Sequence, residues 1–296
     1  QSGIRSLLIS GGERVERSFV GLRTDIELFP QLATVIEESL PADAKSVSLA
    51  VGMTGLTRSQ SEPQKLLKIV DSRVTSVYLA HDSITGFLGS MGLNQGTVTA
   101  VGTGVVTLAV GANRLARVDG WGHLIGDAGS AYWIGRAGLE AGMRAYDGRI
   151  SGTQLITLLQ ENFSDPEEAY IEVQTNLNRV SVIASFARRV IELAETDSTA
   201  RKIVDQAGTE LALSAVTAAR RAGTLEAENP RFSWAGNMIK ADLLREVFVS
   251  AVTEAVPSAS IHEPLAEPID GVALLPTLAK DSPLRKVVFS AERVSV

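Results

Sequence analysis

The spacing of hydrophobic positions in the first hundred residues predicts alternating strands and helices. Short apolar runs predict strands at residues 4–10, 14–21, 46–52 and 73–80. Apolar residues three and four positions apart predict helices at residues 27–40, 63–71 and 81–92. Gly11–Gly12, between the first two strands, is a hairpin turn signal. This order predicts an α/β domain with an antiparallel hairpin at its edge.

A second unit is expected to begin near Gly96. Its β-rich runs predict strands over residues 96–101, 105–112, 114–120 and 231–236. Helical spacing dominates residues 130–221 and returns at 241–256, and a final long helix is expected within 267–280. We therefore expect an N-terminal α/β domain over residues 1–95 and a C-terminal α/β domain over residues 96–296. The second domain would carry a helical insertion at about 130–222.

The composition is that of a globular protein and excludes several classes of function. Of the 296 residues, 45% are hydrophobic and 21% are charged. The net charge of −6 argues against partners such as nucleic acid or an anionic membrane, which require a basic surface. No cysteine is present, which excludes disulfides, thiol catalysis and iron–sulfur clusters and fits a reducing cytoplasm. No apolar run reaches the length of a membrane span.

Two glycine turns have the composition of phosphate or nucleotide sites. Gly102, Thr103 and Gly104 lie between two strands, where glycines can point consecutive backbone N–H groups at an anion. The alternative is an ordinary hairpin turn. Gly236 and Asn237 follow an apolar strand and precede a helix, which is where α/β folds present backbone to nucleotides. Here the alternative is a simple β–α turn.

One carboxylate stands out at the end of a predicted strand. Asp82 follows His81 at the start of the helix expected over 81–92. Aspartate is a preferred N-cap, so a capping role explains it without any chemistry. The functional alternative is a catalytic carboxylate at the mouth of a site.

Aromatic residues and glycines are concentrated in residues 120–135. This stretch holds two of the three tryptophans, one of the three histidines and five glycines. Ser130 is expected to lie near a helix cap, with Tyr132 and Trp133 packing inward. His123 is expected to be a hydrogen-bonded structural residue, with a catalytic role as the alternative.

Several motifs in this order resemble one family. They are HDSITGFLG (81–89), VGTGVVTLAV (101–110), DGWGHLIGDAGSAYWIG (119–135), the helical run 181–207 and WAGNMIKADLLREV (234–247). Together they resemble the BadF/BadG/BcrA/BcrD ATPase family, in particular its N-acetylglucosamine kinase-like branch. The resemblance extends more distantly to the sugar kinase, Hsp70 and actin superfamily. It spans nearly the whole chain, and the stretch 119–135 is its most specific part.

The resemblance implies an α/β fold of two ribonuclease H-like (actin-like ATPase) domains flanking a cleft that holds ATP and a sugar. It implies that Asp82 is the general base and that it helps to hold Mg²⁺ through water. The residues it implies for ATP binding are Ser2, Gly3, Gly102, Thr103, Gly104, Gly236 and Asn237. The cofactors implied are ATP and Mg²⁺.

The resemblance also implies a sugar pocket. Its residues are Gly120, Trp121, Asp127 and Ala131, together with Thr24 and Asp25 near the 2-substituent of the sugar. The chemistry agrees, because the Asp127 carboxylate can accept hydrogen bonds from two adjacent hydroxyls. For Thr24 and Asp25, helix capping is an equal alternative.

Three departures from the family pattern are visible. Ala128 stands where the family often has an acidic residue. The cysteines of the dehydratase-activating branch are absent, which argues against that branch. The opening QSG resembles the tail of a phosphate loop, so the aspartate of that loop and the preceding strand are expected upstream of Gln1. A chain that truly began at Gln1 is therefore expected to be a poor kinase.

The function expected is an ATP-dependent amino-sugar kinase that phosphorylates O6 of N-acetylglucosamine. Three alternatives stay open: a glucosamine kinase, an N-acetylmuramic acid kinase, or a non-catalytic sugar or nucleotide sensor on the same fold. The expected partner is a small-molecule amino sugar, without nucleic acid or membrane. Whether two copies form a homodimer is left open by the sequence.

Overall fold

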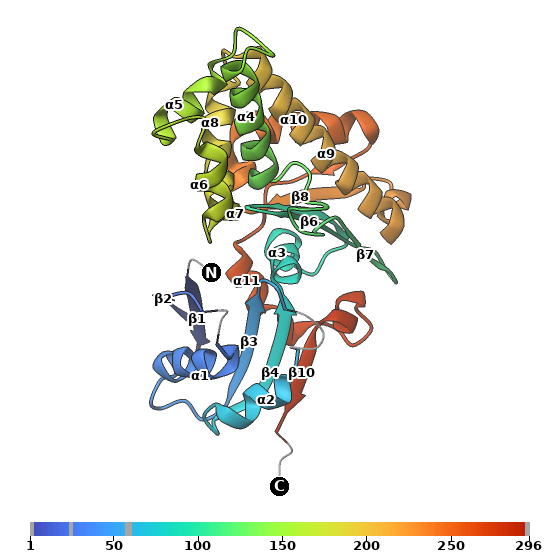
Figure 1. The fold of residues 1–296 in the computed structure, drawn as a ribbon. Coiled ribbons are helices and arrows are strands. Elements are labelled where there is room, and N and C mark those ends of the chain that lie inside the picture. Colours follow the sequence, from blue (N-terminus) through green and yellow to red (C-terminus); the bar gives the residue numbers. More distant parts are fainter. Residues whose placement is uncertain (1–2, 24–25, 57–60, 294–296) are drawn as a thin grey trace. The chain divides into compact units, whose positions relative to one another are not determined.

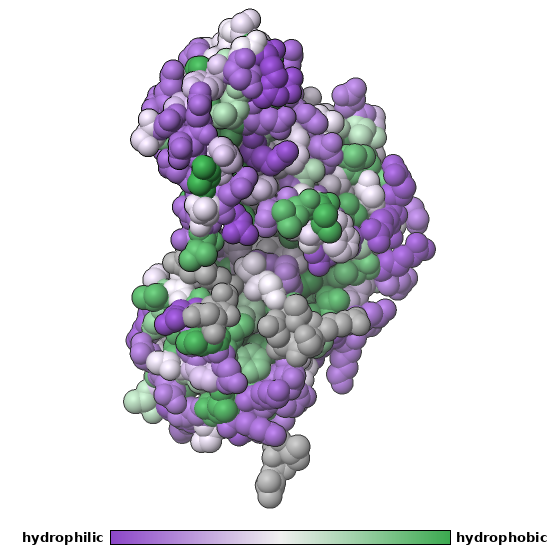
Figure 2. Space-filling view, in the orientation of Figure 1, coloured by the Kyte–Doolittle hydropathy of each residue, from purple (hydrophilic) through white to green (hydrophobic). Residues whose placement is uncertain are grey.

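The computed structural model describes residues 3–23, 26–56 and 61–293 and divides the chain into two compact units (Figure 1). One unit comprises Gln1–Asn94 and Leu265–Val296, and the other comprises Gln95–Pro264. Both combine helices with β-sheet, so the α/β class expected from the sequence is confirmed. Hydrophilic residues cover most of the face shown in Figure 2.

The first unit contains a hairpin and a separate three-stranded sheet. In the hairpin, β1 (Ile4–Ser10) pairs with β2 (Glu13–Phe19), as its glycine turn predicts. In the sheet, β4 (Val74–His81) lies between β3 (Val47–Met53), to which it is parallel, and β10 (Phe289–Glu292), to which it is antiparallel. The helices are α1 (Leu28–Ser39), α2 (Pro63–Ile69), α3 (Asp82–Met91) and α11 (Pro268–Ala273).

The core of the first unit follows from the hydrophobic pattern. Leu32 and Ile36, one turn apart on α1, are buried together with Leu66 of α2. Val77 and Leu79 alternate on the central strand β4 and are completely buried. Burial of one such side chain stabilises a fold by roughly 1.5–3 kcal/mol, and this core holds strand β4 in place. The carboxyl end of β4 carries Asp82.

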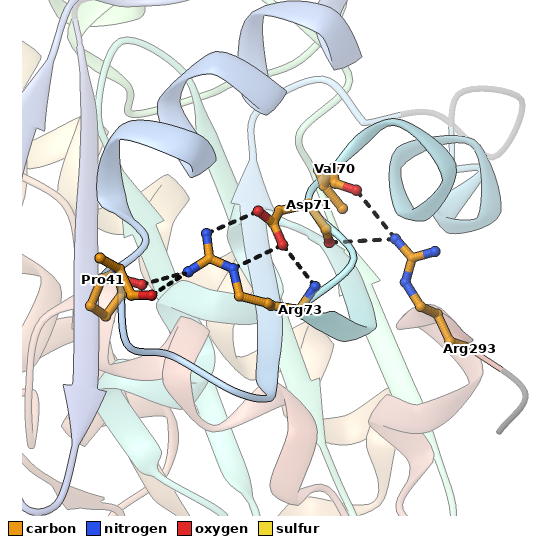
Figure 3. Close-up of polar contacts among 6 residues, drawn as sticks. Pro41, Val70, Asp71, Arg73 and Arg293 are labelled. Carbon is orange, nitrogen blue, oxygen red and sulfur yellow. Dashed lines mark hydrogen bonds and ion pairs between the residues drawn. The ribbon is translucent and has the colours of Figure 1, made fainter.

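The end of the chain returns to the first unit, whereas the sequence analysis assigned it to the second. β10 pairs with β4, and Arg293 just after it donates a hydrogen bond to the backbone oxygen of Leu67 at 2.7 Å. Arg293 also donates to the backbone oxygen of Val70 at 3.2 Å (Figure 3). The contacts of this segment are made by backbone groups far away in sequence, and hydrophobic spacing does not encode them.

An ion pair lies beside this attachment. The Asp71 carboxylate accepts a forked pair of hydrogen bonds, both 2.9 Å, from Arg73, which also donates to the Pro41 oxygen at 2.7 Å (Figure 3). The side-chain and backbone hydrogen bonds from Arg73 lower the pKa of Asp71 to about 2. The pair links the turn before β4 to the segment that follows α1.

The second unit is built on a mixed five-stranded sheet. β5 (Gly96–Val101), β6 (Val105–Val110) and β7 (Leu115–Val118) form an antiparallel meander. β8 (Arg231–Ala235) lies parallel to β5, and the short β9 (Ser260–Ile261) is parallel to β8. The strand order is β7-β6-β5-β8-β9.

Most helices of the second unit lie between β7 and β8 in sequence, as predicted. They are α4 (Ala131–Tyr146), α5 (Thr157–Asn162), α6 (Ala169–Thr175), α7 (Arg179–Ser185), α8 (Ala187–Leu193) and α9 (Ser198–Ala222), with α10 (Asp242–Ala255) after β8. The long helix α9 packs against β5, β6 and β7 and against α10. Asp197 caps α9 by accepting hydrogen bonds from the N–H groups of Thr199 and Ala200.

The prediction of a final long helix within residues 267–280 is wrong. Helix α11 ends at Ala273, and the chain continues as a short 3₁₀ turn over Leu275–Thr277. Pro276 lacks a backbone N–H and cannot continue the α-helical ladder. Further 3₁₀ turns are Gln154–Ile156, Thr224–Glu226, Met238–Lys240 and Pro283–Val287. In the described parts of the chain, no helix combines the length and the apolar character needed to cross a membrane.

Candidate active site

Asp82 is the first residue of helix α3, directly after strand β4. The helix is capped by the residue before it, since the His81 side chain accepts a hydrogen bond from the N–H of Ser83 at 3.2 Å. The alternative expected from the sequence, with Asp82 as the N-cap, is therefore wrong. The Asp82 carboxylate lies in the first turn, where the partial positive charge of the helix N-terminus favours an anion.

The Asp82 carboxylate is held from both sides. The Thr54 hydroxyl, directly after β3, donates to Oδ2 at 2.7 Å. His81 Nδ1 lies 2.9 Å from Oδ1 and donates to it when that nitrogen carries a proton; without the proton, the same nitrogen accepts the N–H of Ser83. Burial pulls the pKa of Asp82 upward, but His81, Thr54 and the Ser83 N–H outweigh it, so the pKa lies below its ordinary value. The side chain is 44% exposed. Asp82 is thus an ionised, oriented carboxylate that a solute can reach.

The Gly102–Gly104 turn is attached to the start of helix α4. The Gly102 oxygen accepts from the N–H of Ala131 at 3.0 Å, and the Thr103 oxygen accepts from the N–H of Tyr132 at 3.1 Å. In a planar trans peptide the N–H points opposite to the C=O. The N–H groups of Thr103 and Gly104 therefore point away from α4, as an anion-binding turn requires.

Asp127 lies in the loop between β7 and α4, residues 119–130, with its side chain against Gly104. A Cβ built on Gly104 would lie 2.6 Å from Asp127 Oδ2, so a side chain at position 104 would require the carboxylate to move. Oδ1 accepts a long hydrogen bond, 3.3 Å, from the N–H of Gly122. Asp127 is buried, and this desolvation, together with the charge of Asp119, raises its pKa above the ordinary value.

Asp119, which sequence reasoning did not single out, organises the same loop. Its Oδ1 accepts hydrogen bonds from the N–H groups of Gly120 and Asp127, both at 2.8 Å. Its Oδ2 accepts from the N–H of Ala128 at 3.1 Å. Asp119 followed by Gly120 is a turn dipeptide, and this was the signal available in the sequence.

The aromatic residues of this region divide between surface and core. Trp121 is 59% exposed, and the guanidinium of Arg117 lies 4.9 Å from the centre of its ring. Ser130 caps α4 by accepting from the N–H of Trp133, which confirms the expected cap. Trp133 and Tyr132 are half-buried against the core of the unit. His123 is half-buried with its ring 4.7 Å from that of Tyr132.

The second glycine turn lies beside the first. Gly236 directly follows β8 and has φ of +93°, a conformation that favours glycine. A Cβ built there would lie 2.3 Å from the oxygen of Val101, the last residue of β5. Asn237 follows and precedes the 3₁₀ turn Met238–Lys240. The two turns therefore meet at the carboxyl ends of the parallel strands β5 and β8.

The other predicted residues are placed as follows. Gly120 and Trp121 follow Asp119 in the 119–130 loop, and Ala131 is the first residue of α4. Gly3 immediately precedes β1. Ser2, Thr24 and Asp25 lie outside the described residues. Among the residues that are described, no group of three or more acidic, histidine or cysteine side chains could hold a metal ion.

In both units the candidate residues lie at the carboxyl ends of parallel strands: Thr54 and Asp82 after β3 and β4, and the two glycine turns after β5 and β8. This is where open α/β sheets bind their ligands. The family model for the BadF/BadG/BcrA/BcrD ATPase family matches residues 28–275. The chain belongs to this family, which confirms the resemblance drawn from its motifs.

Named relatives are similar over different lengths. A protein of Dictyostelium discoideum named N-acetyl-D-glucosamine kinase is 28% identical over 77% of this chain and 74% of its own length. A protein of Clostridium acetobutylicum named N-acetylmuramic acid/N-acetylglucosamine kinase is 28% identical over 36% of each chain, so the match spans only about a third of that relative.

Solved structures share the fold. The putative N-acetylglucosamine kinase of Porphyromonas gingivalis superposes with a TM-score of 0.71 at 16% identity, covering 92% of this chain and 94% of that one. The putative N-acetylglucosamine kinase of Chromobacterium violaceum gives a TM-score of 0.63 at 22% identity, covering 83% and 82%. At these identities the likeness concerns the fold alone.

Proposed function

We propose that the protein is an ATP-dependent amino-sugar kinase that phosphorylates O6 of N-acetylglucosamine, with Asp82 as general base. The observation that carries the proposal is the Asp82 carboxylate, which is ionised, oriented by Thr54 and His81, and exposed at the end of β4. Membership of an ATPase family supports the use of ATP. The names of the two relatives support an amino sugar as acceptor.

In this proposal each residue has a definite task. Asp82 accepts the proton of the attacking hydroxyl, which needs a carboxylate that is deprotonated at working pH. Asp127 accepts hydrogen bonds from two sugar hydroxyls, and Gly120, Trp121 and Ala131 line the same pocket. Charge-assisted bonds to a buried carboxylate orient a sugar strongly.

The glycine turns are assigned to the nucleotide. The N–H groups of Thr103 and Gly104 contact phosphate oxygens, and the turn at Gly236 and Asn237 contacts the adenosine. Gly3 and Ser2 would complete the phosphate site from the amino-terminal side. We further propose that the two units are ribonuclease H-like domains that flank a cleft holding both substrates.

The residues present could hold magnesium through one carboxylate and water. Mg²⁺ in kinases is bound by one or two carboxylates, phosphate oxygens and water, so it needs no dense cluster of protein ligands. Asp82 is the carboxylate that would hold the ion, through water. Its Oδ2 also accepts the hydrogen bond from the Thr54 hydroxyl. When bound, Mg²⁺·ATP supplies the phosphoryl group and neutralises charge on it.

A second acceptor, N-acetylmuramic acid, is favoured by one observation. The relative from C. acetobutylicum is named for both sugars. The two sugars share the 2-acetamido group and differ by a lactyl ether on O3. Contacts of Thr24 and Asp25 with the 2-substituent would therefore not distinguish them, and both residues lie outside the described part of the chain.

The test is sugar-dependent ADP release by the full chain with ATP and Mg²⁺. The panel contains N-acetylglucosamine, glucosamine, N-acetylmuramic acid and glucose. The proposal expects the highest kcat/KM with N-acetylglucosamine. A higher kcat/KM with N-acetylmuramic acid would favour that sugar as the acceptor. If no sugar in the panel stimulates ADP release, a non-catalytic sensor would be favoured.

A further inference from the structure

We propose that Asp119 is a positioning residue that holds Asp127 in its binding conformation, a proposal that rests on the proposed function of Asp127. Asp119 follows the last residue of β7, and Asp127 lies eight positions later in the 119–130 loop. The Asp119 side chain bridges these two points. It thereby fixes the shape of the loop that carries the proposed sugar ligand.

The hydrogen bonds of Asp119 join the beginning of the loop to its end. One oxygen accepts from both Gly120 and Asp127 at 2.8 Å, and the other accepts from Ala128 at 3.1 Å. A carboxylate that accepts backbone N–H bonds makes charge-assisted contacts, which are shorter and stronger than neutral ones. One side chain therefore closes a loop whose middle, at Leu124 and Ile125, is highly exposed.

The backbone conformation of the loop shows why the hydrogen bonds of the Asp119 carboxylate are needed. Asp119 and Asp127 are the non-glycine residues with positive φ among those the structure describes, at +58° and +59°. This left-handed region is sterically unfavourable for residues with a Cβ, although aspartate tolerates it better than most. The N–H bond to Asp119 holds Asp127 at this φ, and this φ directs its carboxylate toward Gly104.

The space inside the loop is shaped around the same carboxylate. A Cβ built on Gly126 would lie 2.5 Å from Asp119 Oδ1, so this position has no room for a side chain. Arg117 Nε donates to the Asp119 backbone oxygen at 3.2 Å. In the described chain the hydrogen bonds of Asp119 stay within the segment 117–128, so we infer that its effect on the Gly102–Gly104 turn passes through Asp127.

The experiment uses three variants of the full chain. Asp119→Gly removes the carboxylate but adopts φ of +58° without steric cost. Its effect therefore reports the loss of the carboxylate hydrogen bonds and not backbone strain. Asp119→Asn keeps one acceptor oxygen and also tolerates the left-handed region. The matched control is Asp205→Asn on α9, which removes the charge of an exposed carboxylate paired with Arg201.

Two measurements distinguish positioning from general stability. The first is amide hydrogen exchange at Asp127 and Ala128, followed by NMR without any ligand. We expect exchange at least tenfold faster in Asp119→Gly, an intermediate rate in Asp119→Asn, and no change in Asp205→Asn. Unchanged exchange at both amides in Asp119→Gly would overturn the proposal.

The second measurement is steady-state kinetics with N-acetylglucosamine. We expect the sugar KM of Asp119→Gly to rise at least tenfold, with kcat within threefold and the ATP KM within twofold of wild type, and partial recovery in Asp119→Asn. An equal rise in both KM values would indicate a merely structural role. If wild type phosphorylates no amino sugar, the proposed function fails, while the exchange rates still decide the role of Asp119.

Discussion

The carboxylate of Asp127 occupies the space that a side chain on Gly104 would need, since a Cβ there would lie 2.6 Å from Oδ2. A Cβ on Gly102, in contrast, would meet no atom within 4 Å. The two glycines of one turn are therefore constrained differently. Gly104 couples the proposed phosphate turn to the proposed sugar ligand, and Gly102 leaves open space in front of the turn.

This difference predicts opposite outcomes for two matched variants. Gly104→Ala forces the Asp127 carboxylate, the end of a side chain that can move, to shift. We therefore expect at least tenfold weaker sugar binding with little loss of stability. Gly102→Ala should leave the thermal midpoint within about 1 °C of wild type. Gly102→Ala should also keep the sugar affinity of wild type. Calorimetry measures the sugar affinity and thermal unfolding measures the stability, and equal sugar affinities for the two variants would contradict this assignment.

Asp82→Asn tests the general base. Because His81 and not Asp82 caps helix α3, the variant should keep the fold and bind sugar normally. We expect a modest loss of stability, since the lowered pKa of Asp82 means that its charge favours the folded state. Its kcat should fall by at least about a hundredfold, the usual size of general-base catalysis. Stopped-time ADP assays give kcat, and Thr54→Val serves as a control that removes only one hydrogen bond to the carboxylate. Retention of most of the kcat in Asp82→Asn would show that another group takes the proton.

Asp127→Ala tests the sugar ligand. Each lost charge-assisted hydrogen bond should cost about 1.5–3 kcal/mol of sugar affinity, so two lost bonds make binding undetectable at millimolar sugar. The ATP KM should change little, because the turn that carries Thr103 remains attached to α4. Isothermal calorimetry with N-acetylglucosamine checks this, and unchanged affinity would remove Asp127 from the pocket.

The raised pKa of Asp127 predicts a pH dependence of stability. Burial favours the protonated form in the folded state, so the folded protein holds this proton to a higher pH than the unfolded chain does. Between the ordinary pKa of aspartate and the raised one, stability must therefore fall as pH rises. Asp127→Asn lacks this titration. The free energy of unfolding of wild type minus that of Asp127→Asn should decrease from pH 4 upward and then level off, as measured by urea unfolding. An increase over that range would show that the pKa is lowered instead.

Much of the fold could be predicted because it depends on local signals. The hairpin turn at Gly11–Gly12, the helical spacing of α1 and the meander around Gly102–Gly104 are all encoded within a few residues. The return of β10 to the first unit could not be predicted, because its partners on β4 are about two hundred residues away. The last helix ends earlier than hydrophobic spacing predicts, because Pro276 lacks the N–H that would continue it.

The candidate site also has parts that the sequence predicts and parts that it does not. Asp82 and the glycine turns stand at the ends of recognisable strands, where α/β folds place ligands. The roles of His81, Thr54 and Asp119 depend on hydrogen bonds whose geometry no spacing rule supplies. A positive φ is uncommon for a residue with a Cβ, and the Asp119–Gly120 turn signal does not reveal which aspartates adopt it.

The most direct test of the central claim is the identity of the phosphorylated product. The full chain is incubated with ATP, Mg²⁺ and N-acetylglucosamine, and the mixture is followed by ³¹P NMR with correlation to the sugar protons. The account predicts a phosphomonoester signal coupled to the two C6 protons, and none with 6-deoxy-N-acetylglucosamine. A phosphate attached elsewhere on the sugar would contradict O6 as the acceptor. The absence of any sugar phosphate would contradict the assignment as a sugar kinase.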